Sequence, residues 1–215
     1  MAYRSSVSAE FILELIKLDI LRGESVDPLP STNRRLVEAR LRYAVHGDAG
    51  LMRKISQPYH EELNRAYYLA SPRHLPRPFG LIAATVGIEP VVAALGMLIS
   101  QRFFGFKIPM PAATVRVRNG TEEVRIYGGD PLPGHRYALL DDICRQGETI
   151  IKALNFWLAR GYDIDRVIVF TDSGEGGLKR IEEEVGRVQK DRGNSIEVTC
   201  LVSPEDILYV IDATK

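Results

Sequence analysis

Two adjacent carboxylates, Asp141 and Asp142, stand at the end of an apolar run and directly before a short polar loop. The loop contains Gly147 and leads through Thr149 into a segment with helical periodicity. Paired carboxylates can accept hydrogen bonds from the vicinal hydroxyls of a sugar, and free backbone N–H groups at a helix start can hold a phosphate. These residue types and their spacing predict a site for a phosphorylated sugar.

Other proteins with parallel sheets use a similar pair of aspartates for different chemistry. Such pairs also occur as Mg²⁺ or Walker B-like carboxylates and as the acids of receiver domains. The position of Gly147 and Thr149 behind the pair, with Gly134 just ahead of the strand, favours the sugar phosphate.

The segment from His135 to Thr149 resembles the phosphoribosyl pyrophosphate (PRPP) motif of type I phosphoribosyltransferases. In that motif an apolar strand precedes two acidic residues, a glycine-containing loop and a closing threonine or serine. The family usually has threonines where this chain has Arg145 and Gln146. Backbone N–H groups of this loop can therefore still bind the phosphate, but the hydrogen bonds from threonine hydroxyls are missing. The resemblance implies that PRPP is bound by Asp141, Asp142, Ile143, Cys144, Arg145, Gln146, Gly147, Glu148 and Thr149.

Two further loops resemble the orotate phosphoribosyltransferase branch of this family. Thr85, Val86 and Gly87 are similar to its pyrophosphate loop, in which small residues let backbone N–H groups approach the leaving group. The acidic, glycine-rich segment 172–177 implies base contacts from Ser173 and Gly174. Orotate enzymes commonly have an arginine at the position of Ser173, and a hydroxyl cannot give the bidentate recognition of a carboxylate. The identity of the base therefore stays open.

The family's mobile loop corresponds to residues 114–120. Arg116 fits the arginine of that loop, which implies a catalytic role for Arg116 beside the two aspartates and, with Arg118, contacts to pyrophosphate. The chain has no lysine between Lys107 and Lys152, so the family's loop lysines are absent. Arg118 or Arg125 could replace them electrostatically, although a guanidinium is not geometrically equivalent to an ammonium. Solvated charges on a hairpin are an equally good explanation of these arginines.

The activity implied by the resemblance is transfer of a phosphoribosyl group from PRPP to a nucleobase, in nucleotide biosynthesis or salvage. It implies Mg²⁺ bound mainly through the sugar donor, no metal ligands of the protein's own, and a homodimer. The alternative is a non-catalytic PRPP- or nucleotide-sensing regulator. Such a regulator could also bind DNA, because one stretch of the chain is rich in cations. A net charge of zero and the lack of a helix-turn-helix signature count against DNA binding. These cations are Arg34, Arg35, Arg40, Arg42, Arg53 and Lys54.

Composition indicates a single globular protein with a substantial core. The chain has 215 residues, of which 45% are hydrophobic and 26% are charged. No apolar run is long enough to span a bilayer and the N-terminus lacks a secretory signal, so we expect a cytoplasmic protein. The two cysteines, Cys144 and Cys200, indicate neither a disulfide framework nor a zinc cluster.

From Phe79 onward, strands and helices alternate, which predicts an α/β core with a mainly parallel twisted sheet flanked by helices. The expected strands are residues 79–84, 113–117, 124–127, a run ending at Asp142, 166–171 and 196–202. The expected helices are residues 91–102, 149–159, 177–192 and a last one capped by Ser203. Residues 79–215 would form this core.

Residues 1–78 are predicted to be mainly helical, and the resemblance implies that they form a hood over the base. The proline-dense connector 71–78 separates them from the sheet. The apolar residues with helical periodicity are Phe11, Ile12, Leu15, Ile16, Leu18, Leu36, Val37, Leu41, Ala44, Val45, Ile55, Tyr59 and Leu63.

Overall fold

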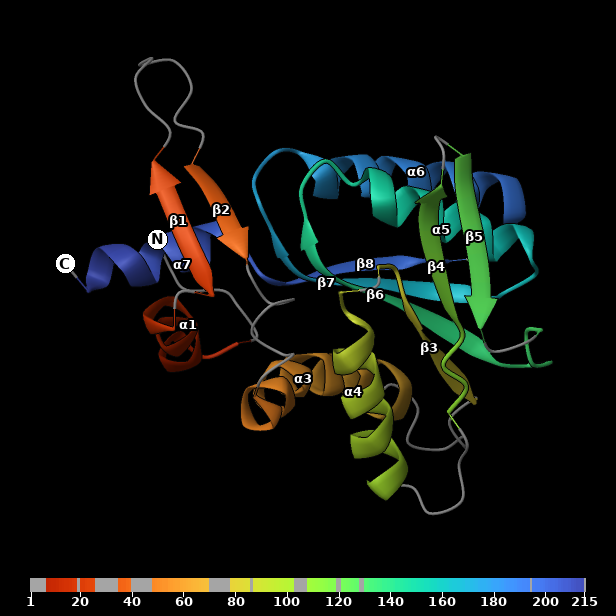
Figure 1. Cartoon of the computed structure of the whole chain (residues 1–215), viewed down its shortest axis with the longest axis horizontal. Helices are drawn as coiled ribbons and strands as arrows, with labels where there is room; N and C mark the ends of the chain where they lie inside the picture. The colour runs from red at the N-terminus through yellow and green to blue at the C-terminus, as the bar shows by residue number, and fades with distance from the viewer. Residues whose placement is uncertain are drawn as a thin grey trace.

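A computed structural model of the chain shows a central β-sheet with helices on both faces (Figure 1). The structure describes residues 7–18, 20–25, 35–39, 48–69, 78–85, 87–102, 108–118, 121–127, 130–193 and 195–214. None of the helices in these ranges is long and apolar enough to cross a membrane.

The central sheet has six strands in the order β5-β4-β3-β6-β7-β8. Strands β3, β4, β6, β7 and β8 run parallel to one another, and β5 is antiparallel to β4 at the edge. Strand β3 is buried along its whole length, as expected for a strand covered on both faces. The predicted α/β class and mainly parallel sheet are confirmed. The strands are β3 (Phe79–Ala83), β4 (Ala112–Arg118), β5 (Thr121–Tyr127), β6 (Arg136–Cys144), β7 (Ile164–Asp172) and β8 (Glu197–Val202).

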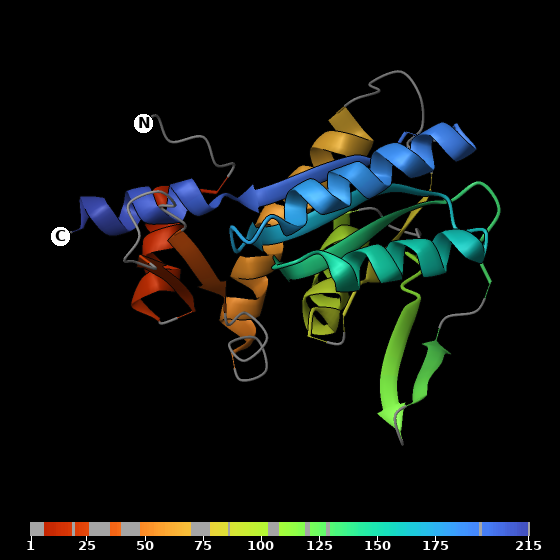
Figure 2. The ribbon, with the colours of Figure 1, turned by 90° about the horizontal axis from the view of Figure 1, so that it is seen from above.

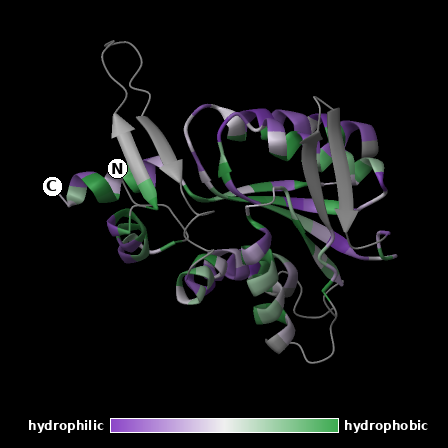
Figure 3. Cartoon of the chain, viewed as in Figure 1, coloured by the Kyte–Doolittle hydropathy of each residue, from purple (hydrophilic) through white to green (hydrophobic). Residues whose placement is uncertain are grey.

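Helices cover the sheet in two layers (Figure 2). Helices α5 (Glu148–Ala159) and α6 (Gly177–Arg192) pack on one face, where Trp157 and Ile181 are fully buried. Helices α3 (Ala49–Asn64) and α4 (Glu89–Arg102) pack on the other face and against each other. Hydrophobic residues fill both layers between helices and strands, whereas the outer side of α6 is strongly hydrophilic (Figure 3).

The N-terminal part combines helices with a small sheet. It contains α1 (Ala9–Lys17), the antiparallel pair β1 (Leu21–Ser25) and β2 (Arg35–Ala39), α3, and the π-helix η1 (Arg65–Leu69). The last helix, α7 (Pro204–Ala213), returns to pack against α1 and β1, so the first and last helices lie side by side (Figure 1). Buried residues of α1, α3 and α7 belong to the same hydrophobic core as those of β3, β6 and β7.

The helical prediction for Leu36 and Val37 is wrong, because residues 35–39 form strand β2. Two adjacent apolar residues fit a helix and a short strand equally well, and pairing with β1 decides between them. Leu41, Ala44 and Val45 lie outside the described residues. The helical predictions for α1 and α3 are correct.

Strands that follow β3 are added first on one side of it, as β4 and β5, and then on its other side, as β6, β7 and β8. From β3 the chain crosses through α4 to β4 on one side, whereas β6, β7 and β8 follow one another on the other side. At such a switch point the loops beyond the strand ends diverge to opposite faces and leave room for a ligand. The loops after β3 and β6 are therefore the structural frame for a site.

Candidate functional site

The loop after β6 ends in a helix start whose backbone donors are free. Gly147 is the N-cap of α5, has a left-handed backbone with φ of 77°, and provides no side-chain hydrogen bond to the helix. By contrast, Ser8, Asp48 and Ser203 cap α1, α3 and α7 with their side-chain oxygens. Among the described residues, none accepts a hydrogen bond from the N–H groups of residues 145–147. This loop can therefore donate several hydrogen bonds to a phosphate.

Two glycines hold this loop against the next one along the sheet. A Cβ atom on Gly147 would lie 2.7 Å from the carbonyl oxygen of Gly177, and one on Gly177 would lie 2.2 Å from that of Arg145. Helix α6 has the same kind of start, with Gly176 as a left-handed N-cap that makes no side-chain hydrogen bond. The close approach of the two loops is possible only because both positions lack a side chain.

The acidic pair lies within β6, which continues for two residues beyond the expected strand end. The side chains of Asp141 and Asp142 are only 3% and 4% exposed. Of the residues assigned to PRPP, Ile143 and Cys144 are thus strand residues, and the carbonyl of Cys144 accepts a hydrogen bond from the N–H of Ser173 at 2.8 Å. The exposed part of the motif is Arg145, Gln146, Glu148 and Thr149.

The two carboxyl groups differ in their partners. Asp142 accepts a hydrogen bond on Oδ1 from the N–H of Ile143 at 2.9 Å, and Asp141 accepts one on Oδ1 from the hydroxyl of Thr85 at 2.8 Å. The pKa of Asp141 is raised to about 8, mainly by burial and also by the neighbouring charge of Asp142, against the lowering effect of the hydrogen bond from Thr85. The pair therefore holds a proton near neutral pH that a ligand could displace.

The loop after β3 lies beside the acidic pair. Its first residue, Ala84, donates a backbone hydrogen bond of 2.8 Å to the carbonyl of Leu140, and Thr85 contacts Asp141 through its side chain. Gly87 is buried where the chain turns into α4, and Val86 lies outside the described residues. The structure thus brings Thr85, predicted to contact pyrophosphate, into direct contact with a residue predicted to contact ribose.

Arg116 and Arg118 occupy a two-stranded ribbon formed by β4 and β5, which projects away from the rest of the sheet (Figure 2). Ala112 pairs with Ala83 at the end of β3, so β4 continues past the edge that carries the acidic pair. At roughly 3.3 Å per strand residue, Arg116 lies about 13 Å along β4 from that pairing. In the ladder Arg116 is opposite Glu123 and Arg118 is opposite Thr121.

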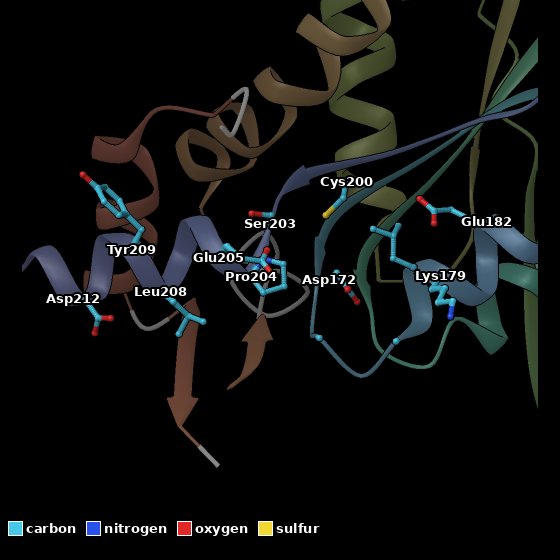
Figure 4. Close-up of a pocket in the computed structure, with 13 residues that line it drawn as sticks. Asp172, Lys179, Glu182, Cys200, Ser203, Pro204, Glu205, Leu208, Tyr209 and Asp212 are labelled. Atoms are coloured by element: carbon cyan, nitrogen blue, oxygen red, sulfur yellow. The ribbon is translucent and has the colours of Figure 1, made fainter. Parts of the chain in front are cut away.

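The loop between β7 and α6 borders a pocket of about 780 Å³ (Figure 4). Gly174 lines the pocket, but Ser173 is only 1% exposed and its hydroxyl donates a hydrogen bond to Glu175 at 3.1 Å within the loop. Four carboxylates and a single ammonium line the pocket, so it suits a ligand with hydrogen-bond donors better than an anion. These groups are Asp172, Glu182, Glu205, Asp212 and Lys179.

Asp172 connects this pocket with the strand edge. Its Oδ1 atom is buried and has no hydrogen-bond partner among the described residues, and burial raises the pKa of its carboxyl group. In the sheet register Asp172 is the partner of Cys144, two residues beyond Asp142. The pocket thus lies on the far side of the β7–α6 loop from the predicted phosphate loop.

The cysteines and the described acidic residues provide neither a nucleophile nor a metal cage. Burial raises the pKa of Cys144 and of Cys200 to about 12, so both thiols stay protonated at neutral pH. In the ranges described above, no three His, Cys, Asp or Glu side chains are grouped as metal ligands. A divalent cation at the acidic pair would need ligand oxygens from a bound phosphorylated sugar.

The sequence did not predict a role for Tyr59 at this site. Tyr59 lies on α3, is fully buried, and donates a hydrogen bond of 2.6 Å from its hydroxyl to the backbone oxygen of Asp141. Helical periodicity indicated only that this residue faces the core. No local signal could show that α3 reaches a strand 82 residues away.

No family model matches the chain. Its sequence is 28% identical over 99 residues to an orotate phosphoribosyltransferase of Pyrobaculum aerophilum (43% of this chain, 49% of the relative) and 30% identical over 97 residues to one of Nostoc sp. (44% and 45%). The matches span about half the length of these curated relatives. The crystal structure of orotate phosphoribosyltransferase from Aeropyrum pernix superposes with a TM-score of 0.61 at 19% identity, covering 94% of this chain and 98% of that one.

Proposed function

We propose that this chain, which has the fold of type I phosphoribosyltransferases and resembles orotate phosphoribosyltransferases in sequence, transfers a phosphoribosyl group from PRPP to a nucleobase. One observation carries the proposal. The uncapped start of α5, with free N–H groups at residues 145–147, directly follows the buried pair Asp141 and Asp142 at the switch point of the sheet.

In the proposed complex the protein orients the sugar. The bond from the anomeric carbon to pyrophosphate breaks as positive charge develops at that carbon, and no covalent intermediate with the protein is needed. Asp141 and Asp142 accept hydrogen bonds from the two ribose hydroxyls, and the backbone of residues 145–149 holds the 5′-phosphate. Fixing both ends of the ribose phosphate presents the anomeric carbon to the acceptor nitrogen in one orientation. Positive charge that develops at this carbon is stabilised by the adjacent carboxylates.

The leaving pyrophosphate would lie between the loop after β3 and the β4–β5 ribbon. Backbone N–H groups of residues 85–87 approach it from one side, and Arg116 and Arg118 approach it when the ribbon bends inward. Mg²⁺, bound mainly through PRPP oxygens, supplies neutralisation of the pyrophosphate charge.

The base would bind near Gly174 and Ser173, at the loop that follows β7. We assign the chain to the orotate-like branch of nucleotide biosynthesis or salvage, in the cytoplasm and as a homodimer. Ser173 lacks the positive charge that would pair with a carboxylate, which favours a base with N–H donors over a strongly anionic one. The acceptor therefore needs to be found with a panel of bases rather than with orotate alone.

A second candidate function is a PRPP or nucleotide sensor without turnover. The observation that favours it is the position of Arg116 and Arg118 on the projecting ribbon, together with the absence of a lysine between Lys107 and Lys152. The DNA-binding version has less support. Of its six cations, Arg35 lies in a strand, Lys54 pairs with Glu14 at 2.5 Å, and three lie outside the described residues.

Pyrophosphate release distinguishes the two candidates. Purified protein is mixed with PRPP, Mg²⁺ and a panel of purine and pyrimidine bases including orotate. Pyrophosphate release that depends on one of the bases supports the enzyme, and PRPP binding without release with any base supports the sensor. Absence of PRPP binding would refute both.

The variant Asp142→Asn tests the ribose assignment in the same assays. Loss of a charged hydrogen-bond acceptor should weaken PRPP binding about tenfold or more, since such a bond contributes about 1.5–3 kcal/mol. Asp191→Asn, an exposed change on α6, is the matched control and should leave affinity unchanged. Equal affinities of the wild type and Asp142→Asn in calorimetry, with unchanged thermal unfolding, would contradict the assignment.

A further inference from the structure

Tyr59 makes a contact that joins helix α3 to the acidic pair of β6. Its hydroxyl donates a hydrogen bond of 2.6 Å to the backbone oxygen of Asp141. That oxygen belongs to the peptide group between Asp141 and Asp142. This peptide lies within β6, which is paired with β7, so the hydrogen bond adds a contact from α3 to the stretch of backbone that carries both carboxyl groups.

The surroundings of Tyr59 keep its hydroxyl in the form that donates. The ring is fully buried and lies 6.1 Å from the ring of Phe170, centre to centre, in a tilted arrangement. Burial raises the pKa of Tyr59 far above its ordinary value, and the charges of Asp142 and Asp141 raise it further. The phenol therefore stays neutral, and its proton is directed at the carbonyl of Asp141.

The local structure of α3 is unusual immediately before Tyr59. Pro58 lies inside the helix, where a proline removes one backbone hydrogen bond and destabilises the helix. Two residues earlier, the hydroxyl of Ser56 donates a hydrogen bond of 2.8 Å to the carbonyl of Met52. Departures from ideal local structure are expected at functional or strained sites.

We propose that Tyr59 is a positioning residue for the ribose site, which holds the peptide between Asp141 and Asp142 so that both carboxyl groups face the sugar hydroxyls. The inference rests on the proposed function, because it assigns those carboxyls to ribose. It also gives α3 a direct part in ligand binding. The N-terminal portion is then more than a cover over the base.

Tyr137 provides a matched comparison on the same strand. Its ring is 1% exposed, and its hydroxyl accepts a hydrogen bond of 3.0 Å from the N–H of Leu132. Tyr137→Phe and Tyr59→Phe therefore each remove one buried hydroxyl and one hydrogen bond. Only Tyr59→Phe removes a hydrogen bond to a residue of the acidic pair.

The test is the affinity of the full chain for PRPP with Mg²⁺, measured by calorimetry. Tyr59→Phe should raise the dissociation constant about fivefold to tenfold, as expected for one hydrogen bond of roughly 1 kcal/mol or slightly more. Tyr137→Phe should change it less than twofold. If Tyr59→Phe lowers the melting temperature strongly, a variant with 4-fluorophenylalanine at residue 59 is tested in its place. Its fluorine fills the space of the hydroxyl but cannot donate a hydrogen bond.

A second readout separates positioning from general loosening of the structure. Ribose 5-phosphate and 2-deoxyribose 5-phosphate differ only in the 2-hydroxyl, one of the two hydroxyls assigned to the acidic pair. The wild type should prefer the ribose compound, and removal of the Tyr59 hydroxyl should reduce this preference. A purely structural effect would weaken both ligands equally.

The outcomes distinguish this inference from the proposed function. A wild type that binds neither PRPP nor ribose 5-phosphate would refute the proposed function itself. Binding by the wild type, with either unchanged affinity or an unchanged preference for ribose in the Tyr59 variants, would overturn only the role of Tyr59. Weaker PRPP binding together with a reduced preference for ribose would support it.

Discussion

Asp141 combines two properties that are difficult to reconcile in an ordinary core residue. It is almost fully buried, yet it is a carboxyl group next to a second one. Burial raises its pKa from 3.8 to about 8. A group of this kind destabilises the folded chain whenever it has to lose its proton, so its retention in the core suggests a use in binding.

We expect the free energy of unfolding to depend on pH through the ionisation of Asp141. In the unfolded chain Asp141 ionises near its ordinary pKa of 3.8, and in the folded chain near about 8. Between these values the folded state binds more protons, so raising the pH lowers the free energy of unfolding. Below both pKa values, or above both, Asp141 adds no pH dependence.

Asp141→Asn should remove this contribution. Urea unfolding of the wild type and the variant at about pH 5 and about pH 8 measures the difference directly. The wild type should lose more stability than the variant between the two pH values. An equal loss in both proteins would show that the carboxyl group ionises normally in the fold.

Residue types and the resemblance pointed to the acidic pair and to the loop with Gly147, because these residues are adjacent in sequence, and their ligand roles stay predictions. The contacts from Thr85 and Tyr59 to Asp141 were not predictable in this way. They depend on how β3 and α3 approach β6. Ser173 shows the opposite case, since its assignment to the base came from a motif, whereas the structure places its hydroxyl inside its own loop.

At the scale of elements, the interlocked starts of α5 and α6 control the shape of the predicted phosphate loop. Gly177→Ala would place a Cβ 2.2 Å from the carbonyl oxygen of Arg145 and 2.6 Å from the sulfur of Cys144. The loop would have to move, so both stability and PRPP affinity should fall. Overpacking of this kind typically costs about 1–3 kcal/mol.

The same helix offers a control of opposite sign. Gly186 lies inside α6, and a Cβ at that position would meet no atom within 4 Å. Gly186→Ala should therefore stabilise the chain by about 0.5–1 kcal/mol, because alanine is the better helix former. Thermal unfolding should move in opposite directions in the two variants. A shared direction would contradict the interlocked geometry.

Most elements after Phe79 were predictable within a few residues, since each strand is a short apolar run that ends in turn residues. The beginning of α7 was also readable, and the structure contains the capping box of Ser203 and Asp206. The small sheet of β1 and β2 was not predictable. Its five-residue strands have too few residues to show a period, and their pairing alone stabilises them.

At the scale of the whole molecule, the first and last helices complete one hydrophobic core with the sheet. Ile207 on α7 is fully buried in that core, whereas Leu208 beside it is partly exposed and lines the pocket. Ile207→Ala should lower the free energy of unfolding by about 2–4 kcal/mol, and Leu208→Ala by clearly less. Urea unfolding measures both. Equal losses would mean that α7 does not depend on this core.

The central claim is that Asp141 and Asp142 bind a ribose while the amides of residues 145–149 bind its 5′-phosphate. A crystal structure of the chain with PRPP and Mg²⁺ tests this claim most directly. We predict the two ribose hydroxyls within hydrogen-bond distance of these carboxyl groups, and the 5′-phosphate at the start of α5. PRPP bound at another place, with the acidic pair still closed by Thr85, would contradict the account.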